Sequence, residues 1–395
     1  MRRRSDQRKG ARKHHPNSVP ADQPAAEKRS SVARRPSVAE RPSETGGPMR
    51  RGKRFRRAAW LMLSASIVFG VHYAVGTAEE ETVAQNLNVP LPTLGGTQFW
   101  TDYVHRDGYR IQKNALTGHW RLLDPGNTRR AWGSREDVDA QLEALRPQSV
   151  GGESGAAPRK LPAVVLVHGL MRTDHSMKSL EERLRQEGYG HVIRFGYAST
   201  RQPLADSAAA LREVLEGQPQ GTEFCFVGHS MGNILVRHVL GDARRDGDPK
   251  KLLLRCHAMV MLGPPNNGAM IAKRLGSTGV FGWVAGPGAL ELGPNWDDVA
   301  SKLDTPAFPF AIVAGNVPAK TIRNPLVEGD SDFVVCVEEA RLEGAEVFRE
   351  VPILHSFLMN DPDIQDWTIE FLQRHLEEDM KPKGTTESGS HRSAQ

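Results

Sequence analysis

A serine at the centre of the pentapeptide G-H-S-M-G is the residue of this sequence best placed to do chemistry. The apolar run 224–227 before it predicts a buried strand, and the amphipathic run that starts at Asn233 predicts a helix. A strand, tight turn and helix would hold Ser230 in a strained turn above the edge of a sheet. Gly228 and Gly232 are required there because a Cβ at either position would meet neighbouring backbone. The alternative interpretation is an ordinary glycine-rich turn between a strand and a helix. The choice between the two depends on whether the rest of the chain supplies residues that could activate Ser230.

A histidine and an aspartate that could activate this serine lie far downstream. A serine hydroxyl is a weak nucleophile at neutral pH, and it needs a base to take its proton and a carboxylate to orient that base. His355 follows the last expected strand and precedes the closing helix, where we expect a base carried by a loop. Asp332 directly precedes an apolar run and is the favoured acid, with Asp330 as its competitor. Alternatively, His355 is an incidental surface residue and the aspartates only cap a turn.

Ester chemistry at such a serine also requires donors for the oxyanion of a tetrahedral intermediate. We expect these donors to be the backbone N–H groups of Met231 and Leu170, each worth about 3 kcal/mol of barrier. Leu170 follows His168 and Gly169 at the end of another apolar run. His168 is expected to orient the loop that carries Leu170, and His229 to pack beside the elbow.

The elements that must position these residues alternate from Leu161 onward. Expected strands cover 163–167, 192–197, 224–227, 258–262, 309–313 and 346–351, and expected helices cover 177–188, 205–215 and 364–376. This alternation predicts an α/β fold with a mostly parallel, doubly wound sheet and helices on both faces. Ligand sites of such sheets lie beyond the carboxyl ends of the strands, where Ser230 falls. The glycine-rich apolar segment 276–296 is expected to be a small cap over the site or an irregular loop.

Several short motifs together resemble the α/β-hydrolase superfamily, on its bacterial lipase and esterase branch. The resemblance covers about Leu161 to His375, and nothing before it. Its motifs are V-H-G-L at 167–170, the Ser230 pentapeptide, L-G-P-P-N-N-G at 262–268, D-F-V-V at 332–335 and L-H-S-F at 354–357. The resemblance implies ester hydrolysis through an acyl-enzyme, without a cofactor or metal, and a Ser230, Asp332 and His355 triad. One departure is that family members usually have glycine after the acid, where this chain has Phe333.

The first 57 residues differ in charge from the rest of the chain. They hold 18 Lys and Arg against 5 Asp and Glu, a net charge of +13, whereas the whole chain carries +5. The remaining residues therefore carry −8. Because the positive charge lies in one Pro-, Ser- and Arg-rich segment without interleaved aromatic residues, we expect a disordered basic tail and no nucleic-acid partner. Attraction of the basic tail to anionic lipid headgroups explains its charge more simply than nucleic-acid binding does.

An uncharged apolar stretch, residues 58–76, follows the basic tail. As a helix, its first 18 residues would span about 27 Å, close to the thickness of a bilayer's hydrocarbon core. Preceding cations and following acids predict a single-pass membrane protein with a cytoplasmic N-terminus and an extracytoplasmic catalytic domain. The alternative is a cleaved signal peptide, if translation starts at Met49, which would give a periplasmic or secreted protein.

The remaining segments are less informative. Residues 79–146 form a small accessory segment of unknown role, with a hairpin expected over 108–123 and a helix over 135–145. Its Trp and Tyr residues are expected to form a core, or alternatively to line a binding face. Residues 147–160 read as a linker, 161–378 as the catalytic domain and 379–395 as a disordered tail. The three cysteines are widely spaced and predict buried thiols.

These features predict a membrane-tethered or exported serine hydrolase that cleaves carboxylic esters, of lipids or other acyl compounds. An acyltransferase or a thioesterase with the same triad is the alternative among enzymes, because sequence does not show which acceptor the site admits. The alternative from another class is a noncatalytic, membrane-anchored binding protein on a hydrolase scaffold.

Overall fold

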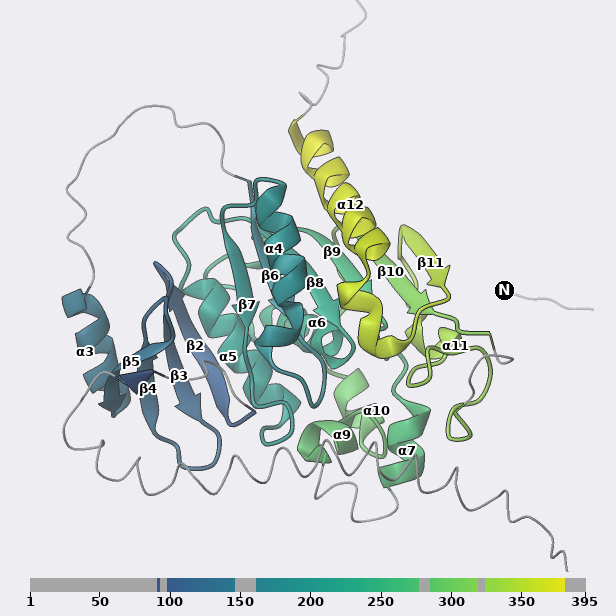
Figure 1. Ribbon diagram of the computed structural model, residues 1–395, viewed down its shortest axis with the longest axis horizontal. Coiled ribbons are helices and arrows are strands. Elements are labelled where there is room, and N and C mark those ends of the chain that lie inside the picture. The colour runs from purple at the N-terminus through teal and green to yellow at the C-terminus, as the bar shows by residue number, and fades with distance from the viewer. Residues whose placement is uncertain (1–90, 93–97, 146–160, 277–284, 319–323, 381–395) are drawn as a thin grey trace, which may run out of the picture. The chain divides into compact units, whose positions relative to one another are not determined.

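The expected parallel sheet is present in the computed structural model as six strands in the order β11-β10-β9-β8-β6-β7 (Figure 1). All neighbouring strands in it are parallel. The strands are β6 (Ala163–Val167), β7 (Val192–Phe195), β8 (Phe224–His229), β9 (Cys256–Leu262), β10 (Phe310–Gly315) and β11 (Val347–Val351). The chain places β7 on one side of β6 and then adds β8 to β11 on the other side, which is the predicted doubly wound pattern.

The structure describes residues 91–92, 98–145, 161–276, 285–318 and 324–380. The predicted basic tail, the membrane or signal segment and the linker lie outside these ranges, as does almost all of the predicted C-terminal tail. Within the described ranges, no helix combines the length and the apolar character needed to cross a bilayer. All described residues belong to one unit, His72–Gln395.

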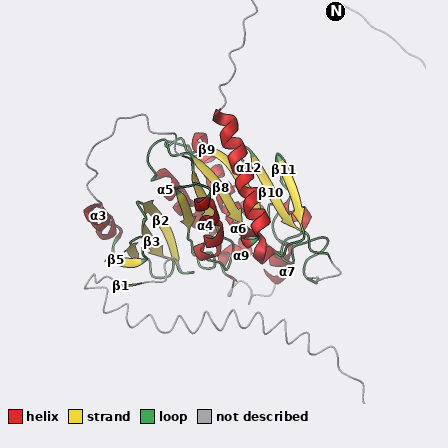
Figure 2. Ribbon diagram, turned by 45° about the horizontal axis from the view of Figure 1, so that its top comes forward, coloured by secondary structure: helices red, strands yellow, loops and turns green. Residues whose placement is uncertain are grey.

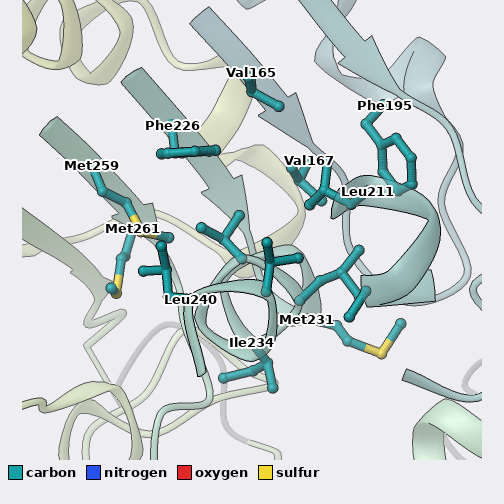
Figure 3. Packing of buried hydrophobic residues seen from close by; sticks show 14 of the residues in the cluster. Val165, Val167, Phe195, Leu211, Phe226, Met231, Ile234, Leu240, Met259 and Met261 are labelled. Carbon is teal, nitrogen blue, oxygen red and sulfur yellow. The ribbon is translucent and has the colours of Figure 1, made fainter. Parts of the chain in front are cut away.

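Both faces of the sheet are buried along its inner strands, and this explains the apolar runs of β6, β8 and β10. Side chains alternate between faces along a strand, so Val165 and Val167 belong to one core cluster, whereas Val164 and Leu166 belong to the other. Helices α5 and α6 complete the first cluster, and α4 and α12 complete the second. Figure 3 shows part of the first cluster, where strand residues such as Phe226 pack with helix residues of α6.

Helices lie in the connections between the strands, and Figure 2 shows them on either side of the sheet. They are α4 (Lys178–Gln186), α5 (Leu204–Glu216), α6 (Met231–Asp246), α7 (Met270–Gly276), α9 (Pro287–Glu291), α10 (Trp296–Ala300), α11 (Val337–Ala340) and α12 (Pro362–Met380). Short 3₁₀ helices occur at Asp174–Met177, Leu253–Arg255 and His355–Asn360. The predicted helices correspond to α4, α5 and α12, and α12 runs four residues beyond the predicted end, into the segment expected to be a disordered tail.

The segment expected as a cap or an irregular loop contains short helices. Residues 277–284 lie outside the described ranges, and the rest includes the end of α7, all of α9 and the start of α10. Helix α9 packs tightly beside the elbow: a Cβ at Gly288 would lie 3.1 Å from the sulfur of Met231. Whether this segment covers a bound substrate stays a prediction.

The accessory segment folds into a second, antiparallel sheet of five strands in the order β1-β5-β4-β3-β2. Its elements are β1 (Leu91–Pro92), β2 (Trp100–Arg106), β3 (Tyr109–Asn114), β4 (Trp120–Leu123), β5 (Thr128–Gly133) and helix α3 (Arg135–Leu145). The predicted hairpin is the β3–β4 pair, and the predicted helix is α3. Trp100 and Trp132 are buried with their rings 5.4 Å apart, which supports a core role for these two residues.

The three cysteines, Cys225, Cys256 and Cys336, are buried and unbridged, as predicted. Burial raises the pKa of the Cys336 thiol to about 11, so this side chain stays protonated at neutral pH. The cysteines therefore belong to the packing of the fold.

Candidate active site

Ser230 lies in the strained turn that the sequence predicts. It joins β8 to α6 with φ 54° and ψ −125°, a backbone conformation that residues other than glycine rarely adopt. The glycines on either side have no room for a side chain. A Cβ at Gly232 would lie 2.3 Å from the carbonyl oxygen of Val167, and one at Gly228 would lie 2.2 Å from Oδ1 of Asn233. The tight crossing of these segments holds the serine at the carboxyl edge of the sheet.

Asp332 and His355 are brought together from loops that follow β10 and β11. Nδ1 of His355 lies 2.6 Å from Oδ2 of Asp332, and the backbone N–H of His355 donates to the Asp332 carbonyl at 2.9 Å. The other carboxylate oxygen accepts the N–H groups of Val334 and Val335 at 2.9 and 2.7 Å. A carboxylate can only accept, so it holds the hydrogen of His355 on Nδ1 and leaves the Nε2 lone pair available as a base.

The competing acid, Asp330, is not part of this arrangement. Its side chain is exposed, and its backbone carbonyl accepts the N–H of Val337 at 2.8 Å. Asp332 is 1% exposed and occupies the position beside His355. Phe333, which stands where related proteins usually have glycine, adopts φ 85°. The turn thus keeps a left-handed backbone even though this chain has a bulky residue there.

His229 and Gly263 bring Ser230 and His355 into the same neighbourhood. Nε2 of His229, the residue before the serine, lies 3.0 Å from the carbonyl oxygen of His355, and the two rings have centroids 4.8 Å apart. The N–H of Ser230 donates to Leu262, and a Cβ on the next residue, Gly263, would lie 3.0 Å from Nδ1 of His355. No direct hydrogen bond joins Ser230 to His355 in the described residues. Such bonds often tighten only when substrate binds.

The predicted oxyanion donors lie next to the serine. A Cβ at Gly169 would lie 2.9 Å from Cβ of Ser230, so the loop that carries Leu170 passes directly over the elbow. Met231 is the first residue of α6, where N–H groups have no acceptor within the helix. The positive end of the helix dipole adds to its attraction for an anion. Met171, next in the loop, has φ 58° and is the third residue of this site, after Ser230 and Phe333, with a left-handed backbone.

His168, which was predicted to orient this loop, makes hydrogen bonds at the start of the loop and to Tyr197. Its Nδ1 lies 2.9 Å from the Gly169 carbonyl oxygen, which can only accept, so Nδ1 carries the hydrogen. Its Nε2 accepts the N–H of Tyr197 at 3.4 Å, and the Tyr197 hydroxyl donates to the His168 carbonyl at 2.8 Å. The two rings stack with centroids 4.3 Å apart. Tyr197 was not predicted as a site residue, because in the sequence it is only the end of an expected strand.

Both histidines beside the catalytic candidates are held neutral. Burial lowers the pKa of His168 to about 4, and burial with the neighbouring His355 lowers the pKa of His229 well below its ordinary value. Neither group can therefore serve as a base that titrates near neutral pH, and both act through hydrogen bonds.

Burial of neutral His168 predicts that acid weakens the fold. Between pH 6.5 and pH 4 the unfolded chain binds a proton that the folded chain excludes, so the free energy of unfolding falls as the pH falls. For this histidine alone the loss between pH 7 and pH 5 should be about 2 kcal/mol. Urea unfolding at the two pH values measures it. His168→Gln cannot be charged and should show a smaller loss; an equal loss in both proteins would contradict the assignment.

A cavity of about 990 Å³ lies at the other edge of the sheet. Its lining includes Leu161, His191 and Glu223, which lie at or before the amino ends of β6, β7 and β8. Because ligands of parallel sheets bind beyond the carboxyl ends, this cavity is not the candidate substrate site. In the described part of the chain, no group of three or more His, Cys, Asp or Glu side chains is arranged to hold a metal ion.

A parallel doubly wound sheet, a serine at a strained strand-to-helix turn and an aspartate–histidine pair beyond the same edge define the α/β-hydrolase fold. The sequence also matches the profile of the alpha/beta hydrolase family over residues 164–393. This match covers more than half of the chain, so the chain belongs to that family.

Solved structures similar to this chain are distant. A lipase of Bacillus licheniformis in its mature form matches with a TM-score of 0.44 and 17% identity over 56% of this chain and 96% of the lipase. A metagenomic carboxyl esterase matches with a TM-score of 0.41 and 19% identity over 59% of this chain and 82% of the esterase. No curated protein sequence matches the chain.

Proposed function

We propose that this protein is a serine hydrolase that cleaves carboxylic esters, with Ser230 as nucleophile, His355 as base and Asp332 as the acid that orients it. The observation that carries the proposal is the 2.6 Å contact between His355 and Asp332 beside the strained Ser230 elbow. What supports a catalytic role for this pair is its place: it lies beyond the carboxyl ends of the strands, next to the elbow that carries Ser230. The preferred substrates are lipid or other acyl esters.

In the first half of the proposed reaction, Oγ of Ser230 attacks the ester carbonyl carbon while Nε2 of His355 takes the hydroxyl proton. The carbonyl oxygen becomes an oxyanion, and the N–H groups of Leu170 and Met231 stabilise it. When the intermediate collapses, the carbon–oxygen bond to the alcohol breaks and His355 gives its proton to the leaving alkoxide. The acyl group remains on Ser230.

In the second half, a water molecule attacks the acyl-enzyme while His355 takes one of its protons. The tetrahedral intermediate forms again at the same oxyanion donors, and its collapse returns the proton to Oγ of Ser230 and releases the carboxylic acid. Asp332 remains ionised throughout, because its role is to hold the Nδ1 hydrogen and to stabilise the imidazolium form of His355.

A p-nitrophenyl ester panel of increasing acyl length tests the proposal on the full-length protein. Hydrolysis is expected, together with labelling by a fluorophosphonate probe, which reacts with activated serines. A thioester and an alcohol acceptor in parallel assays separate a thioesterase and an acyltransferase from the hydrolase. A folded protein that neither hydrolyses an ester nor binds the probe would instead be a noncatalytic scaffold.

We also propose that residues 58–76 tether the protein to a membrane, with the basic N-terminus in the cytoplasm and the catalytic domain outside it. The charge distribution around this uncharged stretch supports the proposal. Mass spectrometry of the mature chain isolated from membranes is expected to recover peptides containing Trp60. A mature protein that starts after residue 76 would show that the segment is a cleaved signal, and the protein would then be periplasmic or secreted.

A further inference from the structure

The small antiparallel sheet contacts the catalytic unit through two consecutive buried residues of β2. The N–H of Asp102 donates to the Gly196 carbonyl at 2.9 Å, and the Asp102 carboxylate accepts the Gly196 N–H at 2.7 Å. The hydroxyl of Thr101 accepts the N–H of Ala198 at 3.0 Å and donates to Oε1 of Gln202 at 2.6 Å. Thr101 and Asp102 are both fully buried. Thr101 and Asp102 therefore make hydrogen bonds to the backbone of residues 196–198 on both sides of Tyr197.

Asp102 makes its hydrogen bond to the Gly196 N–H in the ionised form. Burial alone would raise its pKa, but His105 and Arg110 lower it to about 2. The amide of Gln112 donates to its second oxygen at 2.6 Å. A charged acceptor makes a stronger hydrogen bond to the Gly196 N–H than a neutral one does.

Tyr197, within residues 196–198, contacts the loop of residues 168–174 that carries Leu170, here called the oxyanion loop. Tyr197 stacks on His168 and donates its hydroxyl hydrogen to the His168 carbonyl, and His168 in turn donates to the Gly169 carbonyl. Gly169 is in contact range of Ser230, and the next N–H along the chain is that of Leu170.

The same sheet also touches the far side of this loop. The Gln98 amide donates to the Met171 carbonyl at 3.4 Å, and Arg110 of β3 lies 3.6 Å from the carboxylate of Asp174, where the loop ends. Arg194 of β7 approaches that carboxylate from the catalytic unit at 3.4 Å. Arg110 of the small sheet and Gln98, just before β2, thus contact the loop directly at Asp174 and Met171, whereas the small sheet reaches the His168 end only through residues 196–198.

We propose that the small sheet positions the oxyanion loop of the catalytic site, with Thr101, Tyr197 and His168 as positioning residues of one hydrogen-bonded relay. This inference rests on the proposed hydrolase function. It gives the accessory segment a role in the transition state rather than in substrate binding. Because oxyanion stabilisation acts on the transition state, loosening the relay lowers kcat and leaves KM nearly unchanged.

Two shape-conserving substitutions in the full-length protein test the relay. Thr101→Val leaves the Ala198 N–H without its acceptor, and Tyr197→Phe keeps the ring but removes the bond to the His168 carbonyl. With p-nitrophenyl butyrate, each should lower kcat about tenfold or more with KM changed by less than about twofold, since losing an oxyanion donor outright costs about 10²–10³. Thr101→Ser keeps the hydroxyl and should restore kcat. The double variant should be no slower than the slower single variant, because both act on one relay.

Glu213→Gln is the matched control. It breaks the 2.8 Å ion pair between Arg135 of the accessory segment and α5, which joins the same two parts of the chain away from the oxyanion loop. Its kcat should equal that of the wild type. If Thr101→Val does not fold, Tyr197→Phe carries the test, because it removes a different bond of the same relay.

Two outcomes would overturn the relay. One is a wild-type kcat in Thr101→Val while the wild-type protein hydrolyses the ester; the other is an equal fall of kcat in Glu213→Gln, which would indicate general docking rather than positioning. Absence of hydrolysis by the wild-type protein, or hydrolysis unaffected by Ser230→Ala, would instead refute the proposed function on which the relay depends.

Discussion

Ser230→Ala should abolish ester hydrolysis and fluorophosphonate labelling while the protein stays folded. Removal of the hydroxyl leaves the oxyanion donors but no nucleophile, and loss of the equivalent serine in a comparable triad costs about 10⁶ in kcat. Alanine keeps the Cβ of serine, so the strained backbone and the packing at the elbow remain. Progress curves at high enzyme concentration measure the residual rate, and circular dichroism melting checks the fold.

Ser207→Ala provides a matched control for this change. Ser207 is a buried serine on α5 whose hydroxyl has no hydrogen-bond partner within the described part of the chain. Its replacement should leave both the rate and the labelling at wild-type level. Probe labelling that persists in Ser230→Ala would identify another nucleophile and refute the assignment of Ser230.

Asp332→Asn should lower kcat by about 10⁴, as loss of the carboxylate does in other serine triads. The two N–H groups of Val334 and Val335 hold one side-chain oxygen in place, so the asparagine oxygen should remain there. Its NH₂ group would then face Nδ1 of His355, which would have to accept. The hydrogen of the neutral ring would move to Nε2, and no lone pair would be left there to take the proton of Ser230.

Asp330→Asn is the control that separates the two acids of this loop. Asp330 is exposed, and within the described ranges only its backbone carbonyl makes a hydrogen bond. The kcat of Asp330→Asn should therefore stay within about twofold of the wild type. A larger loss in Asp330→Asn than in Asp332→Asn would reverse the assignment. The comparison needs matched melting temperatures, because Asp332 is buried and its replacement also affects stability.

Local sequence patterns predicted the six strands of the large sheet. The inner strands β6, β8 and β10 are buried along their whole length and are mainly apolar, whereas the edge strand β11 is partly exposed and carries an arginine and a glutamate. Local patterns also predicted the elbow, since the steric demand at Gly232 comes from a crossing that every such turn contains. In contrast, strand β5 was missed because its sequence, T-R-R-A-W-G, carries two arginines and no clear alternation.

The choice between Asp330 and Asp332 depends on three-dimensional geometry. The two residues are separated by one position and precede the same apolar run, so spacing alone cannot decide which carboxylate turns inward. The hydrogen bond between Thr101 and Ala198 likewise could not be predicted from the sequence. It joins residues 97 positions apart, and its donor is a backbone N–H, which carries no sequence signature. Family membership is shown for 164–393, and it says nothing about the accessory sheet.

Three of the six non-glycine residues with a left-handed backbone in the described ranges lie at the site: Met171, Ser230 and Phe333. They belong to the oxyanion loop, the elbow and the acid loop, and each such conformation disfavours the folded state by about 1–3 kcal/mol. Substitutions that remove this backbone strain should therefore raise thermal stability without loss of activity in surface turns such as the one at Lys251. In the three loops of the site, the same substitutions should disturb the geometry on which activity depends. Catalytic activity and folding stability thus make opposite demands on the backbone conformation of Met171, Ser230 and Phe333.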